Sequence, residues 1–215
     1  MGGGSYNTAS GYGSTVAGGG GNTASADYSF AIGNSAKAQH HRSFVWSDGN
    51  AATDSTTTNQ FVARASGGFM LFSSSGSTGV SLAPGGGSWA SMSDRNAKDG
   101  FEAVDTQEVL AQVAALPLTS WSYKTEAGVR HMGPMAQDFY AAFGKDEYGT
   151  IGNDTTINSA DFAGVSFIAI QALEKRSSGQ QQNISDLKKE NKELKEILLL
   201  LRKEMNELKK QNEKE

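Results

Sequence analysis

Ser93 and Lys98 are the two side chains of this 215-residue sequence whose types and spacing could perform chemistry. A serine hydroxyl is a weak nucleophile until a base removes its proton, and a lysine can be that base if burial or a nearby cation lowers its pKa. Five residues along an α-helix correspond to about 500°, so the two side chains would point roughly 140° apart on a straight helix. The pair can therefore meet only if the backbone between them turns, or if the two side chains come from different subunits.

A structural interpretation of the same two residues is also open. Ser93 could cap the N-terminus of a helix, and Lys98 could be a solvated charge. The spacing alone favours this interpretation, because serine and lysine are common and short motifs arise by chance. The surrounding sequence has to decide between the two.

The pair lies where the composition of the chain changes. Residues 1–92 are rich in Gly, Ser and Thr and hold three basic and three acidic residues, whereas residues 93–176 hold 7 basic and 12 acidic residues. The chain has no cysteine, so disulfides and thiol chemistry are excluded. The net charge of −4 gives no electrostatic case for nucleic acid. We expect no metal ion and no cofactor. We also expect no membrane span, because no apolar stretch reaches the length that a bilayer requires.

Residues 1–48 contain a repeat. Asn7-Thr8-Ala9-Ser10 returns fifteen residues later as Asn22-Thr23-Ala24-Ser25. Each unit has two strand-like pieces separated by Gly, Asn or Ser turns, and the predicted inward positions are Val16, Ile32 and Val45. One such coil cannot bury its apolar side alone, so the coils must stack. A disordered Gly/Ser linker is the alternative, but a linker would not keep its apolar residues in register. Because the chain begins inside a repeat, we expect it to be a fragment of a longer protein.

These units resemble the head repeats of YadA-like trimeric autotransporter adhesins, which form a left-handed parallel β-roll. The resemblance covers residues 4–48 and rests on the Asn-Thr-Ala-Ser runs, on Ser29-Phe30-Ala31-Ile32-Gly33, and on Ala36-Lys37-Ala38 before Ser43-Phe44-Val45-Trp46. It implies three chains side by side and an adhesive, surface-exposed role. It does not name a ligand.

Residues 49–92 are predicted to form a β stalk. Short strands are expected at residues 59–65, 68–72 and 80–82, with turns at 73–78 and 84–87. A segment with so few apolar side chains cannot form its own core, whereas interlocking with two further copies would provide one.

Residues 93–176 carry the pattern of an α+β domain. Helices are predicted at residues 106–116, 136–143 and 161–175, and strands at 120–124 and 129–132. Its first residues, Ser93-Asp94-Arg95-Asn96-Ala97-Lys98, resemble the start of the endosialidase-type intramolecular chaperone domain, the self-removing C-terminal chaperone of phage tail spikes and surface fibres. Further motifs follow in the family's order: Leu116-Pro117, Trp121-Ser122-Tyr123-Lys124, His131 to Phe139 and Val165 to Leu173.

The resemblance, which covers residues 91–176, implies roles for the residues at the seam. Ser93 would be the nucleophile and would become the first residue of the released part, with Lys98 as its partner. Scission would fall between Met92 and Ser93, as a single-turnover serine endopeptidase acting in cis or within the trimer. The chain departs from the family pattern at Arg95, where an acidic residue is usual, and at Ala97, where a large apolar residue is usual.

Residues 177–215 have the clearest periodicity. Spacings of three and four alternate along a predicted seam of a parallel coiled coil, which consists of Ile184, Leu187, Asn191, Leu194, Leu198, Leu201, Met205 and Leu208. The alternative is a single amphipathic helix packed on the preceding domain. Leucine at d with asparagine at a favours a dimer, whereas both resemblances imply a trimer. We expect the homotrimer.

Together these features predict a fibrous trimer with four parts: a β-roll head (1–48), a β stalk (49–92), an α+β chaperone and peptidase domain (93–176) and a coiled coil (177–215). The predicted function is an intramolecular chaperone that drives trimerisation of an extracellular surface or tail fibre and then removes itself. The alternative is a non-enzymatic trimeric adhesin whose C-terminal parts only hold the trimer. A host-surface ligand is possible for either.

Overall fold

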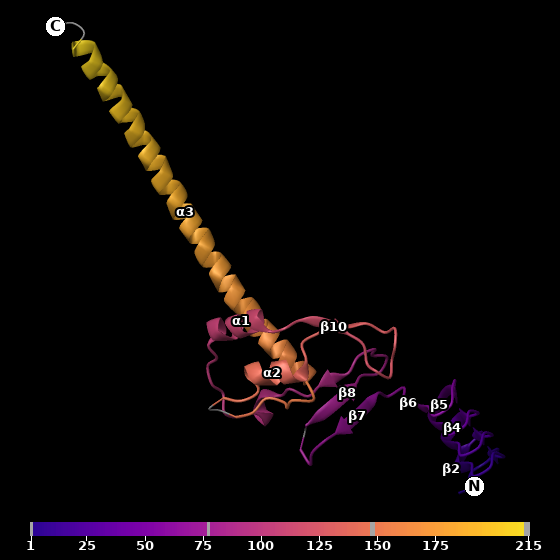
Figure 1. Ribbon diagram of the computed structural model, residues 1–215. Helices are drawn as coiled ribbons and strands as arrows, with labels where there is room; N and C mark the ends of the chain where they lie inside the picture. The colour runs from indigo at the N-terminus through magenta and orange to yellow at the C-terminus, as the bar shows by residue number, and fades with distance from the viewer. Residues whose placement is uncertain (1, 77, 147–148, 213–215) are drawn as a thin grey trace. The chain divides into compact units, whose positions relative to one another are not determined.

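The computed structural model describes residues 2–76, 78–146 and 149–212, with Gln211 described by its backbone only. The chain divides into two compact units, Met1–Gly100 and Phe101–Glu215. Figure 1 labels most of their elements. The first unit contains β1 (Thr8–Ala9), β2 (Thr15–Gly20), β3 (Thr23–Ala24), β4 (Phe30–Ala38), β5 (Phe44–Asp54), β6 (Phe61–Arg64), β7 (Phe69–Phe72), β8 (Gly79–Leu82), β9 (Ala90–Ser91) and the 3₁₀ turn η1 (Arg95–Ala97).

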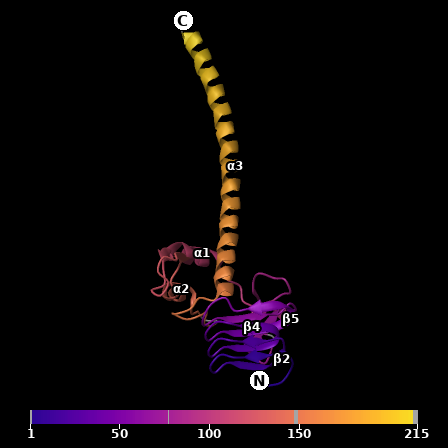
Figure 2. The same ribbon diagram turned by 90° about the vertical axis from the view of Figure 1, so that its right-hand side faces the viewer.

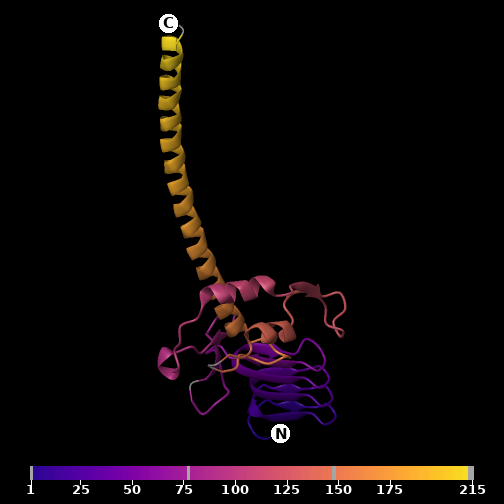
Figure 3. The same ribbon diagram turned by 60° about the vertical axis from the view of Figure 1, so that its left-hand side comes forward.

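Strands β1 to β6 form a parallel β-solenoid, as the repeat predicts. β2, β4, β5 and β6 pair in that order, so that Thr15 lies beside Phe30, Phe30 beside Phe44, and Phe44 beside Phe61. A second column joins β1, β3 and the end of β4. Figures 2 and 3 show the coils stacked one on the next. The left-handedness and the likeness to YadA-type heads remain predictions.

The solenoid core is narrow and made of small side chains. Val16, Ala31 and Val45 occupy equivalent positions of successive coils and are 0% exposed, and Val62 packs against them. The prediction that Ile32 points inward was wrong. Ala31 takes the position of Val16, and successive strand residues face opposite sides, so Ile32 lies beside Trp46 on the other face and is only half-buried.

One corner of each coil has a left-handed backbone. Gly13, Tyr28, Arg42 and Asn59 have φ values of 62°, 55°, 55° and 58°, one residue per coil. Glycine and asparagine tolerate this conformation best, which accounts for Gly13 and Asn59, whereas Tyr28 and Arg42 adopt it although their side chains disfavour it.

The solenoid continues beyond residue 48, where the sequence suggested the end of the head. β5 runs on to Asp54, and the register between β4 and β5 shifts from Asn34↔Asp48 to Ala36↔Thr53. The coil from Phe44 to Phe61 is therefore 17 residues long, compared with 14 from Phe30 to Phe44. The longer coil interrupts the spacing that identified the first repeats.

The rest of the predicted stalk pairs within its own chain. β7, β8 and β9 form an antiparallel sheet, and every described residue from 66 to 92 is at least partly exposed. Met70, Leu71 and Phe72 are 60%, 57% and 56% exposed, which agrees with the expectation that this segment has no core of its own. Ser77, within the predicted turn at 73–78, lies outside the described residues. The interlocking of three copies remains a prediction.

The second unit contains α1 (Thr106–Ala115), β10 (Thr119–Trp121), β11 (His131–Gly133), α2 (Ala136–Phe143) and α3 (Ser159–Asn212). Their positions agree with the predicted helices and strands, although both strands are shorter. Val109 of α1, Phe139 of α2 and Val165 of α3 form one buried cluster, and Leu110, Ala169 and Ala172 form another between α1 and α3. The helices predicted for residues 161–175 and 177–215 form one helix of 54 residues, Ser159–Asn212, and residues 213–215 lie outside the described residues.

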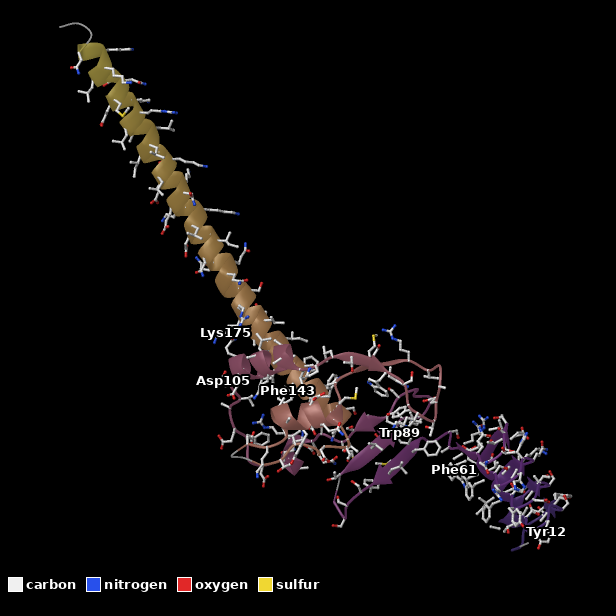
Figure 4. The ribbon with its side chains drawn as sticks, in the orientation of Figure 1. Tyr12, Phe61, Trp89, Asp105, Phe143 and Lys175 are labelled. Atoms are coloured by element: carbon white, nitrogen blue, oxygen red, sulfur yellow. The ribbon has the colours of Figure 1, made fainter. Side chains whose placement is uncertain are left out.

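Beyond Lys175, α3 carries its side chains into solvent (Figure 4). The predicted seam residues are all exposed in the single chain, and the apolar ones range from 46% for Ile184 to 63% for Leu198. This helix is not packed lengthwise on the preceding domain, which contradicts the alternative of an amphipathic surface helix. The coiled coil and its stoichiometry remain predictions. No helix in the described part of the chain is long and apolar enough to cross a membrane.

Candidate functional site

The predicted scissile bond directly follows the last strand of the antiparallel sheet. β9 ends at Ser91, and the Met92 backbone N–H donates to the Gly79 carbonyl oxygen over 3.1 Å. Met92 is half-buried, whereas Ser93 is exposed. The residue on the N-terminal side of the bond is thus held in the sheet, and the chain leaves the sheet at Ser93.

A 3₁₀ turn follows at once. Asp94 is its N-cap, with φ −70° and ψ 129°, and its Oδ1 accepts hydrogen bonds from the Asn96 backbone N–H at 2.9 Å and from Asn96 Nδ2 at 3.0 Å. The N–H of Ala97 donates to the Asp94 carbonyl, and the N–H of Lys98 donates to the Arg95 carbonyl, both over 3.2 Å. These i to i+3 bonds wind the backbone more tightly than an α-helix does.

The turn brings Ser93 and Lys98 together within one chain. Lys98 Nζ donates to Ser93 Oγ over 2.6 Å. Of the two ways in which the pair could meet, the structure therefore has the turned backbone and does not need a second subunit. The structural interpretation was wrong for Ser93, since the helix cap is Asp94 and the Ser93 hydroxyl is engaged by Lys98.

The contact has the geometry that a nucleophile and its base require, which is a hydrogen bond of about 2.6–3.2 Å. In this bond Lys98 is the donor, and to accept the Ser93 proton it must first lose one of its own. Both side chains are exposed in the single chain. Burial would disfavour the charged form of a lysine, and the single chain does not supply it.

His131, another side chain that could act as a base, belongs to the second unit and has structural contacts. Its ring stacks on Trp121 with 4.6 Å between centroids, and its Nε2 lies 3.8 Å from Glu126 Oε2. Trp121 and His131 are direct partners in the β10–β11 pair, so the stack joins the two strands.

Sequence reasoning missed the two groups that hold the site, Asp94 and the Gly79 carbonyl. Asp94 had a recognisable signal, because aspartate is among the best N-cap residues and a polar Asn96 follows it at the distance of a capping bond. The Gly79 contact had none, since it depends on the pairing of β8 with β9, a strand of only two residues.

Comparison with known families supports the importance of this segment. Residues 93–146 match the model of a peptidase family described as the chaperone of endosialidase. The match begins at Ser93 and includes the turn, α1, the β10–β11 pair and α2. No curated protein matches the chain. The segment that starts at the Ser93–Lys98 pair is therefore similar to the chaperone of endosialidase family, which supports a chaperone role for this part of the chain.

Proposed function

We propose that this chain belongs to a trimeric surface or tail fibre, and that residues 93–176 are an intramolecular chaperone that removes itself, together with the coiled coil at 177–215, by cleavage between Met92 and Ser93. The observation that carries the proposal is the 2.6 Å contact between Lys98 Nζ and Ser93 Oγ at the first residue of the family match.

The cleavage step follows from the positions of the two side chains. Lys98, in its neutral form, takes the proton of Ser93 Oγ as this oxygen attacks the carbonyl carbon of Met92. The bond between that carbon and the Ser93 nitrogen breaks, and the nitrogen takes the proton from Lys98. An ester now joins Met92 to Ser93 Oγ. One water molecule hydrolyses the ester, which leaves a carboxylate on Met92 and restores the Ser93 hydroxyl.

The sheet and the turn have different tasks in this step. The Met92 N–H bond to the Gly79 carbonyl keeps the acyl side of the bond on the fibre, and the 95–97 turn keeps the base beside the nucleophile. The reaction occurs once per chain, because its products no longer share a peptide bond.

The chaperone role follows from the cost of assembling a fibre. Interlocked strands form only non-local contacts, so three chains lose much entropy before any contact stabilises them. A helical domain that joins the chains raises their local concentration. Cleavage then removes the assembly device and leaves the fibre kinetically trapped. A fibre of this kind works outside the cell or on a virion, where the solenoid could bind a host-surface ligand.

Mass spectrometry of the purified full chain tests the cleavage. We expect one fragment that ends at Met92 and one that begins at Ser93, and a single intact chain for Ser93→Ala. The matched control is Ser91→Ala, which removes an exposed hydroxyl two residues earlier and should leave the fragments unchanged. Cleavage of Ser93→Ala at the same bond would show that the nucleophile is assigned wrongly.

An intact wild-type chain would instead support the non-enzymatic trimeric adhesin. The exposure of both Ser93 and Lys98 favours this second function. In that case the C-terminal parts only hold the trimer, and the turn at 95–97 connects the two units without chemistry.

A further inference from the structure

We propose that Asp94 is the positioning residue of the Ser93–Lys98 pair and acts through the 95–97 turn. The inference rests on the proposed function, because it assigns a role in the same cleavage. Asp94 does not contact the reacting atoms in this proposal. It fixes the backbone that brings Lys98 back to Ser93.

Asp94 accepts hydrogen bonds at both its side chain and its backbone. A single carboxylate oxygen, Oδ1, accepts from both the backbone N–H and the side-chain amide of Asn96. The Asp94 carbonyl accepts from the N–H of Ala97. Asp94 therefore accepts three hydrogen bonds within the turn, two at its carboxylate and one at its carbonyl.

The turn is not held by burial of its side chains. Each of residues 93–100, all of which the structure describes, is exposed, so burial of apolar side chains does not fix this backbone. A 3₁₀ turn of three residues has weak internal bonds and little cooperativity. Its conformation therefore depends on its cap more than the conformation of a packed helix does.

The turn determines whether the Lys98 side chain can reach Ser93. Lys98 is the residue that follows the turn, and it is extended, with φ −128° and ψ 150°. Its side chain reaches Ser93 because the three turn residues reverse the backbone direction. If the turn unwinds, the five-residue separation places the two side chains apart, and the hydroxyl loses its base.

The experiment compares cleavage rates of full chains that carry Asp94→Ala, Asp94→Asn or Asp94→Ser. Alanine removes the cap, whereas asparagine and serine are also good N-cap residues without the charge. We expect Asp94→Ala to cleave about fivefold more slowly, the change in turn population that loss of an N-cap typically causes. Asp94→Asn and Asp94→Ser should return the rate to within about twofold of wild type.

The matched control is Asp99→Ala, which removes the same charge one residue beyond Lys98 and should cleave as wild type does. A wild-type rate for Asp94→Ala would overturn the inference. An Asp94→Asn rate as slow as that of Asp94→Ala would also overturn it, because the charge and not the cap would then be responsible.

A second measurement does not need cleavage. In the uncleaved Ser93→Ala chain, adding Asp94→Ala should speed amide hydrogen exchange at Ala97 and Lys98 about fivefold, and unchanged exchange would overturn the inference. This separates the two proposals. An intact wild-type chain contradicts the proposed cleavage alone, whereas cleavage that depends on Ser93 but not on Asp94 contradicts the positioning role alone.

Discussion

Asp48 shows how one exposed carboxylate holds the end of the solenoid. Its Oδ2 accepts from the Ser66 hydroxyl and the Ser66 backbone N–H, both at 2.6 Å, and its Oδ1 accepts from the Asn50 N–H at 3.0 Å. These bonds, first those of Ser66 and then that of Asn50, lower the pKa of Asp48 from 3.8 to about 2, and the nearby charge of Arg64 adds to the effect. Ser66 lies 18 residues after Asp48, so the contact joins the segment that follows β6 to the middle of β5.

The direction of this shift predicts an acid-sensitive contact. Because the folded pKa is lower than the unfolded one, the stabilisation is complete above about pH 4 and is lost as the pH falls through about 2. We expect the amide resonance of Ser66 to shift between pH 4 and pH 2 in wild type and to lack this transition in Asp48→Asn. Asp54→Asn, on the same strand, is the control and should keep the transition. A Ser66 amide that does not change over this range would contradict the assignment.

Lys98→Arg separates the two things that Lys98 could contribute, a positive charge and a base. Arginine keeps the charge and comparable reach, but its guanidinium does not lose a proton in proteins. If Lys98 is the base, the cleavage rate should fall at least about 100-fold, the lower range for loss of a general base. Lys124→Arg is the control for the substitution itself. Cleavage of Lys98→Arg at the wild-type rate, followed by mass spectrometry, would assign the lysine an electrostatic role only.

At the scale of the elements, buried Asn22 joins neighbouring coils of the solenoid. Its Nδ2 donates to the carbonyls of Gly18 at 2.9 Å and Gly33 at 2.8 Å, and its Oδ1 accepts from the Ala36 N–H at 2.9 Å. Its own backbone N–H donates to Asn7 Oδ1, one coil earlier. Asn22 is 0% exposed, so its own amide has no access to water.

Asn22→Ala should therefore destabilise the solenoid strongly. It leaves a buried N–H and two carbonyls without their partner, at a cost of about 1–3 kcal/mol for each unsatisfied group. We expect a loss of roughly 3 kcal/mol or more in denaturant unfolding, with faster hydrogen exchange at the Ala36 amide. Asn34→Ala, at an exposed position whose side chain accepts only from the Ser35 hydroxyl, should change stability little. Equal effects of the two substitutions would contradict the role of the buried amide.

Local patterns predicted the solenoid well where the period was constant. The recurrence of Asn-Thr-Ala-Ser placed the coils, but the choice of Ile32 over Ala31 followed hydrophobicity where strand alternation decides the direction. The 17-residue coil after Phe44 escaped detection because its length differs from that of the coil before it. In α3, local propensity was also a poor guide. Gly179 weakens a helix by about 1 kcal/mol, and yet the helix continues through it.

The candidate site was predictable in its residues and not in its geometry. The identity of Ser93 and Lys98 follows from the motif, whereas periodicity gives only helix or strand for the five residues between them. The contact depends on a single 3₁₀ turn. An α-helix is the competing conformation, and the side chain of Asp94 favours the turn by capping it. No periodic pattern distinguishes such a turn.

At the scale of the whole molecule, α3 also leaves apolar side chains exposed before the predicted seam begins. Ile170 and Leu173 are 58% and 50% exposed and lie two heptads before Ile184 and Leu187, in the same a and d positions. Their neighbours Ala169 and Ala172 are buried in a cluster with Leu110 of α1. We propose that the seam between copies begins at Ile170, so that one face of α3 completes the second unit and another joins the trimer.

The contact within one chain bears on whether cleavage depends on assembly. The sequence spacing left open a pair formed by two subunits, but Ser93 and Lys98 already meet in one chain. What the single chain lacks is burial, since both side chains are exposed, and burial disfavours the charged form of a lysine in general. We propose that packing of the three copies supplies this burial. Cleavage would then depend on assembly although its two residues come from one chain.

Leu194→Asp combined with Leu201→Asp tests this dependence by placing charge in the seam, where unpaired charge is costly. The control is Leu199→Asp combined with Leu200→Asp, which introduces the same two charges nearby in α3 at side chains that are 60% and 59% exposed, compared with 57% for Leu194 and 51% for Leu201, but that lie off the seam. The seam variant should form fewer trimers and cleave more slowly, and its cleaved fraction should rise with protein concentration, whereas the control should match wild type. The measurement is the cleaved fraction against time at several dilutions, with the oligomeric state determined in the same samples. Cleavage at an undiminished, concentration-independent rate by a chain shown to be monomeric would mean that the exposed pair is sufficient, and that assembly does not control the reaction.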